Sequence, residues 1–282
     1  MKKLAFLAFV AIIAFSSCGS DELDEPDSQD TPIVGGTSVD HTYVDLGVTV
    51  DGKTIYWATT NVGADNAYDY GNYYAWGETR AYGEEMDSYP YYWNNNLTNQ
   101  AYISGVVKTD YSWSTYKWGD SSSYFFKYYS KDEKLDEDDD AATVNWGSGW
   151  HMPTVDEFYA LTSQCYWKWV TEYNGHTVKG YMVFKLKSKM DKGMKTNNLN
   201  PYTPYAEYTE SDTHIFLPVG GRRNNSSLDD ADYGCYWLST NDLSDVVYAK
   251  CFLINPSSGF GINSQERRFG FAVRPAYEGF DD

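Results

Sequence analysis

The chain has 282 residues, a formal net charge of −18, and a composition that is 42% hydrophobic and 18% aromatic. A disordered chain lacks the apolar surface that offsets the entropy of ordering, so the composition excludes that class. We expect no nucleic-acid partner, because binding phosphates needs clustered Lys and Arg, which the sequence lacks. The 27 Tyr, 10 Trp and 23 Gly favour short strands and ordered loops over helices.

The first 17 residues have the pattern of a lipoprotein signal peptide. Two lysines follow Met1, and residues 4–15 form an apolar run of twelve residues, too short to cross a hydrocarbon core of about 30 Å. The small residues that follow, ending in Cys18 and Gly19, resemble a bacterial lipobox, which implies that Cys18 is acylated and anchors the protein to a membrane. The alternative is an ordinary secretory leader that contains Cys18.

Residues 18–40 are expected to form the lipidated cysteine and a disordered acidic tether. Residues 21–30 contain six acids and no base, and such a segment stays extended and solvated. An acidic run directly after the cysteine also resembles the surface-export signal of Bacteroidetes lipoproteins. That resemblance implies a lipid-anchored protein of the outer membrane that is exposed at the cell surface.

From residue 41 to residue 282 the pattern predicts one domain built mainly from short strands. In the strand over 246–254, the face that carries Ala249, Cys251 and Leu253 is expected to point inward. The expected strands are 54–59, 178–185, 214–219, 246–254 and 269–274.

One helix interrupts the strands. Thr154 and Glu157 have the spacing of a capping box, which predicts a helix that begins after Thr154. Phe158, Leu161 and Cys165 follow at intervals that place them, with Val155, on one apolar face. Trp57, Trp76 and Trp150 are assigned to the core.

Residues 80–146 are more polar and irregular, and we interpret them as a long insertion packed on the same domain, because no linker separates them. Exposed aromatic rings offer flat, rigid contact area for sugars or proteins. The ligand-binding candidates are therefore Tyr92, Trp93, Trp113 and Trp118. If they are surface residues, replacing Trp93 or Trp118 with Ala weakens binding and leaves stability almost unchanged; if they are core residues, stability falls.

A set of short sequence blocks, spread over about residues 43–277, resembles the Fibrobacter succinogenes major paralogous domain family. The sequence departs from that family at His151, where Arg is commoner, and in the insertion. The blocks are 43–47 (YVDLG), 57–64 (WATTNVGA), 70–79 (YGNYYAWGET), 149–154 (GWHMPT), 157–158 (EF), 215–218 (IFLP), 220–222 (GGR), 236–240 (YWLST) and 270–275 (GFAVRP).

The blocks at 152–158 and 270–274 are also distantly similar to the formylglycine-generating, sulfatase-modifying family. That similarity implies an α+β domain with a C-type-lectin-like fold, rich in strands and loops and with few helices. Relatives with this fold include an oxidase, lectins and variable ligand-binding proteins, so the fold does not decide the function.

The sequence indicates no catalytic residue, cofactor or metal site. Cys165, Cys235 and Cys251 do not match the catalytic cysteine pair of the formylglycine-generating enzymes; Cys235 and Cys251 either pair with each other or, with Cys165, are small buried residues. The histidines lack zinc-site spacing, and His151 is interpreted as a structural hydrogen-bonding residue. The acidic run 136–140 is expected to be a solvated loop, with calcium binding as the alternative.

Three functions stay open at this point. The leading interpretation is a non-catalytic recognition module of the outer surface that binds a polysaccharide or a partner protein through aromatic-rich loops. The alternatives are a structural or accessory subunit of a surface appendage and an enzyme that acts on glycans through paired carboxylates.

Overall fold

The computed structural model describes residues 35–38, 41–86, 89–92, 100–103, 105, 107–119, 127–128, 134–257 and 259–278, and for 35–38, 89–92 and 100–103 it describes the backbone alone. All of these belong to one compact unit, Thr31–Asp282. The predicted signal peptide and Cys18 lie outside the described residues. Within the predicted tether, residues 35–38 form a strand.

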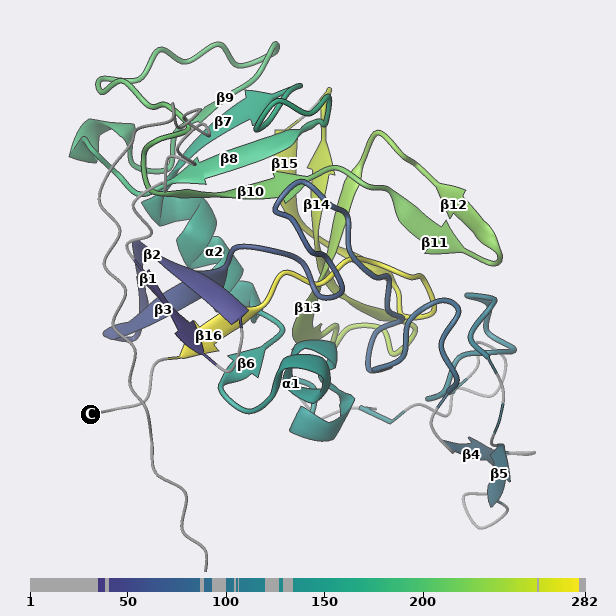
Figure 1. The fold of residues 1–282 in the computed structure, drawn as a ribbon. Helices are drawn as coiled ribbons and strands as arrows, with labels where there is room; N and C mark the ends of the chain where they lie inside the picture. Colours follow the sequence, from purple (N-terminus) through teal and green to yellow (C-terminus); the bar gives the residue numbers. More distant parts are fainter. Residues whose placement is uncertain are drawn as a thin grey trace, which may run out of the picture. The chain divides into compact units, whose positions relative to one another are not determined.

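The described residues form three main sheets and two hairpins, joined by two helices and short 3₁₀ turns (Figure 1). The first sheet has the order β1-β2-β3-β16-β6, so it pairs the start of the domain with its end. Its strands are β1 (Gly35–Ser38), β2 (His41–Val50), β3 (Lys53–Ala58), β16 (Ala276–Glu278) and β6 (Trp150–His151).

The second sheet has the order β10-β8-β7-β9, in which only the β7–β9 pair is parallel, and the third is the antiparallel meander β13-β14-β15. Their strands are β7 (Tyr166–Val170), β8 (Gly180–Phe184), β9 (Lys195–Thr196), β10 (His214–Pro218), β13 (Gly234–Asn241), β14 (Tyr248–Asn255) and β15 (Gly259–Glu266).

The hairpins and helices complete the unit. The hairpins pair β4 (Tyr89–Tyr92) with β5 (Gln100–Ile103) and β11 (Arg222–Asn224) with β12 (Ser227–Asp229), the helices are α1 (Ala141–Trp146) and α2 (Val155–Gln164), and the 3₁₀ turns are Glu137–Asp139 and Lys189–Asp191. The predicted α+β class is confirmed, because the described residues are rich in strands and contain few helices.

Helix α2 begins where the capping box predicts. The Thr154 hydroxyl accepts a hydrogen bond from the Glu157 amide, and the Glu157 carboxylate accepts one from the Thr154 amide. Phe158, Leu161 and Cys165 are fully buried, and Val155 packs at the edge of the same core cluster. The helix packs on β2 and β13 through this face.

Strand β14 is buried on both faces, so the prediction of a single inward face was wrong in part. Ala249 and Cys251 lie in one core cluster, as expected. Phe252 and Ile254, on the opposite face, are fully buried in the other cluster. A strand between two cores carries apolar residues on both faces, and alternation then no longer marks the inner one.

Residues 269–274 do not form the predicted continuous strand. Their backbone pairs through isolated bridges with three different segments: Gly270 with Arg223, Phe271 with Tyr74, and Ala272 with Tyr236. Each residue therefore finds its hydrogen-bond partner in another part of the chain.

The core assignments of Trp57, Trp76 and Trp150 are confirmed, because each is at most 1% exposed. Cys165, Cys235 and Cys251 are buried free thiols. Of the two possibilities for Cys235 and Cys251, the structure has the unpaired one, and burial raises the pKa of the Cys235 thiol to about 12.

A buried arginine joins the end of the chain to two distant segments. The Arg274 guanidinium is fully buried and donates to the Asn61 side-chain oxygen at 2.8 Å and to the carbonyls of Ala58 at 3.1 Å, Thr59 at 3.3 Å and Phe216 at 2.9 Å. Burial lowers its pKa to about 10, which still leaves the group charged at neutral pH.

Replacing this arginine with lysine is predicted to destabilise the fold. An ammonium group cannot reach the same partners in a planar fork, so buried carbonyls lose their donors. We expect Arg274→Lys to lower the free energy of unfolding by about 2–4 kcal/mol, measured by urea denaturation. Lys179→Arg, at an exposed ion pair, is the control and should change stability by less than about 0.5 kcal/mol. An equally small effect of Arg274→Lys would contradict the proposed role.

Candidate functional site

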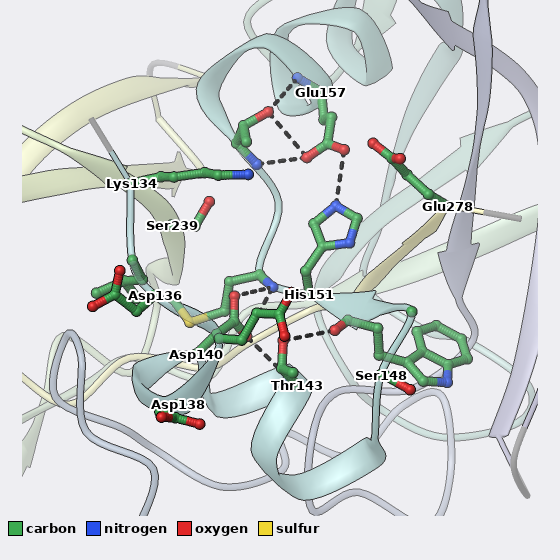
Figure 2. Close-up of a pocket in the computed structure, with 16 residues that line it drawn as sticks. Lys134, Asp136, Asp138, Asp140, Thr143, Ser148, His151, Glu157, Ser239 and Glu278 are labelled. Atoms are coloured by element: carbon green, nitrogen blue, oxygen red, sulfur yellow. Dashed lines mark hydrogen bonds and ion pairs between the residues drawn. The ribbon is translucent and has the colours of Figure 1, made fainter. Parts of the chain in front are cut away.

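An open cleft of about 740 Å³ is the candidate site (Figure 2). Polar side chains dominate its walls, which come from the acidic segment 134–140, from α1 and β6, from the start of α2 and from β13 and β16. The lining residues are Lys134, Leu135, Asp136, Glu137, Asp138, Asp140, Thr143, Ser148, Gly149, Trp150, His151, Met152, Thr154, Glu157, Ser239 and Glu278.

The acidic run on one wall is partly built into the domain. Asp139 is 3% exposed and accepts hydrogen bonds from the Tyr128 hydroxyl and the Lys127 ammonium, each at 2.5 Å. Asp140 is 4% exposed. The expectation of a solvated loop therefore holds only for the exposed Asp136, Glu137 and Asp138.

Asp140 joins two walls of the cleft. Its carboxylate caps helix α1 by accepting from the amides of Ala142 at 2.8 Å and Thr143 at 3.0 Å. It also accepts from the amide of Met152, just after β6, at 2.8 Å. Burial raises the pKa of Asp140, and the amide hydrogen bonds oppose that shift. The residue therefore fixes the position of α1 relative to β6.

His151 and Glu157 form a hydrogen-bonded pair on the opposite wall. His151 Nε2 lies 2.8 Å from Glu157 Oε1, and the other carboxylate oxygen accepts from the Thr154 amide and hydroxyl (Figure 2). Burial alone lowers the pKa of His151, but Glu157 outweighs it and raises that pKa above its ordinary value. Burial raises the pKa of Glu157, and the bonds from His151 and Thr154 lower it overall. The predicted hydrogen-bonding role of His151 is confirmed.

Ser239 carries a buried hydroxyl that has no partner among the described residues. The residue is 3% exposed, lines the cleft, and its Oγ atom makes no hydrogen bond within that part of the chain. A buried hydroxyl that lacks a partner costs about 1–3 kcal/mol. Lys134 reaches across the same part of the cleft in Figure 2 and is exposed, with no ion pair among the described residues. The cleft thus holds a hydroxyl without a hydrogen bond and an ammonium without an ion pair, each judged among the described residues.

The exposed carboxylates differ in their partners. Asp136 lies 3.0 Å from the Lys127 ammonium, and Glu278 lies 3.2 Å from that of Lys53. Glu137 and Asp138 are exposed and form no ion pair within the described part of the chain. Among those residues there is no group of three or more His, Cys, Asp or Glu side chains placed to hold a metal ion.

Two of the aromatic candidates, Trp113 and Trp118, are not among the residues that line this cleft. Trp118 is 8% exposed, and its indole N–H donates to the Gly77 carbonyl, so it belongs to the interior. Trp113 is half-buried and makes an edge contact with Tyr116, with ring centroids 5.6 Å apart. Tyr92 lies in β4, where the backbone alone is described, and Trp93 lies outside the described residues.

Sequence reasoning missed most of the cleft. The Asp140 cap had a usable signal, because Asp followed by Ala141 and Ala142 is a typical helix start. The sequence identifies Glu157 as a capping residue. Its contact with His151 depends on how the chain turns between β6 and α2, which the sequence does not show. Ser239 has no sequence signal, because a hydroxyl without a partner is visible only in three dimensions.

None of the described helices is long and apolar enough to span a membrane. No family model, curated protein or solved structure matches this chain.

The His151–Glu157 pair predicts a pH-dependent contribution to stability. A raised pKa in the folded state means that the contribution is complete below the ordinary histidine pKa of 6.5 and is lost as the pH rises through the folded value. The stability advantage of the wild type over His151→Gln should therefore shrink in urea denaturation as the pH rises above the ordinary histidine pKa of 6.5.

His214→Gln is the matched control for this measurement. Burial lowers the pKa of His214, so its contribution grows as the pH rises toward the ordinary histidine pKa of 6.5 and stays constant above that value. An advantage over His151→Gln that stays constant with pH would contradict the prediction.

The burial of Trp118 yields a separate prediction. Trp118→Ala removes a buried indole and leaves the Gly77 carbonyl without its donor, which should cost about 3–5 kcal/mol of unfolding free energy. Tyr159→Ala, at a side chain that is 65% exposed, should cost less than about 1 kcal/mol. Thermal unfolding followed by circular dichroism compares them, and equal small losses would return Trp118 to the surface candidates.

Proposed function

We propose that the protein is a non-catalytic recognition module that binds a glycan in the cleft around Ser239. The unpartnered Ser239 hydroxyl carries the proposal, because a sugar hydroxyl is the partner that it lacks. Thr143, Ser148 and Lys134 add further hydrogen-bonding groups to the same lining.

The way the cleft uses its titratable groups supports binding rather than catalysis. A general base must be within reach of the proton that it removes. Here His151 Nε2 is engaged by Glu157, and Glu157 is engaged in turn by the cap of α2. Asp140 is buried and accepts three backbone amides. These carboxylates hold the walls in place, which favours a rigid binding site.

The setting of the module is proposed from the sequence. Cys18 in its lipobox-like context and the acidic run after it support a lipid anchor and exposure at the outer surface. We also propose a C-type-lectin-like arrangement for the domain. The capped α2 and the two antiparallel pairings of the terminal strand β16, with β3 and with β6, are compatible with it.

A glycan array with the purified domain tests the function. Saturable binding without turnover is expected, with a signal that falls in Ser239→Ala, since that variant removes the hydroxyl in the cleft. Released product would favour an enzyme that acts on glycans. Absence of any binding would contradict the proposal and favour a subunit of a surface appendage.

Ser239→Ala should also separate binding from stability. Removing a buried hydroxyl without a partner relieves its desolvation cost, so the ligand-free variant should be as stable as the wild type or up to about 1 kcal/mol more stable. The control is Ser163→Ala. The Ser163 hydroxyl donates to the Ala160 carbonyl, so its removal should bring no increase in stability. A clear loss of stability in Ser239→Ala would mean that its hydroxyl already has a partner.

A further inference from the structure

We infer that the glycan bound in this cleft carries free amino groups, as in a de-N-acetylated glucosamine polymer; this rests on the proposed function. The inference starts from charge. Four exposed carboxylates lie in the lining, those of Asp136, Glu137, Asp138 and Glu278, against the one exposed ammonium of Lys134. His151 adds no net charge, because Glu157 balances it when it is protonated.

Two of these carboxylates are available to a ligand. Glu137 and Asp138 form no ion pair within the described residues, whereas Asp136 and Glu278 each have a lysine partner. Neighbouring like charges on one exposed turn repel each other and attract a cation to the space in front of them. A protonated amine on the ligand reduces that repulsion.

The Ser239 hydroxyl makes the cleft more than an acidic patch. It is a buried, unpartnered group in the wall, and it requires a hydroxyl or another neutral polar group opposite it. An amino-sugar polymer carries hydroxyls and ammonium groups along one chain, so it offers both kinds of group that this lining calls for. A basic peptide supplies the ammonium but on a flexible chain, at a larger cost in ordering entropy.

The formal charge of the whole chain agrees with this choice. At −18, the protein repels polysaccharides rich in uronate or sulfate and attracts cationic ones. Such attraction is weak and screened by salt at exposed positions. Selectivity for a cationic glycan must therefore come from the carboxylates that line the cleft. Single substitutions of these residues can test it.

The test compares two probes of equal length, a glucosamine oligomer and its N-acetylated form, by titration calorimetry near pH 6. The free-amine oligomer should bind about tenfold more tightly at low salt, and the difference should shrink as salt is added. Equal affinity of the two oligomers would overturn this inference and leave glycan binding intact. If neither oligomer binds, this inference is overturned, whereas the glycan array decides whether glycan binding survives.

Variants locate the effect. Glu137→Gln and Asp138→Asn should each weaken binding of the free-amine oligomer about threefold and leave the acetylated oligomer unchanged. Asp65→Asn removes the same charge at an exposed position outside the cleft and should change neither affinity. An equal loss in Asp65→Asn would show non-specific attraction and overturn the inference.

A tetralysine peptide distinguishes the remaining source of an amine. Tighter binding of this peptide than of the glucosamine oligomer, with the same loss in Asp138→Asn, would overturn the inference in favour of a basic protein partner. Binding of the oligomer that is tighter than binding of the peptide and that depends on both Asp138 and Ser239 supports it.

Discussion

The fold depends on the buried guanidinium of Arg274. Its donors satisfy carbonyls at the end of β3 and in β10 and the side chain of Asn61, and no carboxylate of the described residues forms an ion pair with it. Such a group is costly to bury, and it is retained only where its geometry satisfies several acceptors at once. Arg267, earlier in the chain, is used in the same way: its buried guanidinium donates to the carbonyls of Tyr248 and Lys127 and to Asn241. In both places a planar guanidinium supplies hydrogen-bond donors to carbonyl groups that, in irregular segments, have no partner strand.

The position of the cleft follows from the hydrogen bonds of the Arg274 guanidinium, which we call the Arg274 clamp. Pro275 follows Arg274, and the next residue, Ala276, begins β16 and pairs with His151 of β6. The clamp thus sets the register of the strand that presents His151, and Glu157 then fixes the histidine ring against helix α2. From the other side, Asp140 binds the amide of Met152. Two buried charged groups therefore hold the walls in place. Asp140 lines the cleft, whereas Arg274 is not among its lining residues.

The sequence predicts the local parts of this arrangement and not the distant ones. The capping box of α2 is readable because Thr154 and Glu157 lie three residues apart and act on each other's backbone. The partners of Arg274 cannot be read in the same way, because Ala58 and Phe216 lie 216 and 58 residues away in the chain. The inner face of β14 could not be predicted, because both faces are buried and the alternation of polar and apolar residues that marks a single inner face is lost. The acidic run looked like a solvated loop because composition does not separate the buried Asp139 from its exposed neighbours.

Some of the buried aromatic residues supply donors where the backbone forms no regular ladder. Loops that join short strands leave carbonyl groups inside the domain, and each needs a donor. The Tyr111 hydroxyl donates to the Tyr73 carbonyl at 2.6 Å, and the Tyr116 hydroxyl to the Trp76 carbonyl at 2.8 Å. The indole N–H of Trp237 donates to the Tyr74 carbonyl at 2.8 Å. An aromatic ring with a polar end fills core volume and satisfies the backbone in one residue. These three rings are used inside the domain, and the recognition proposed above draws instead on the hydroxyls and carboxylates of the cleft.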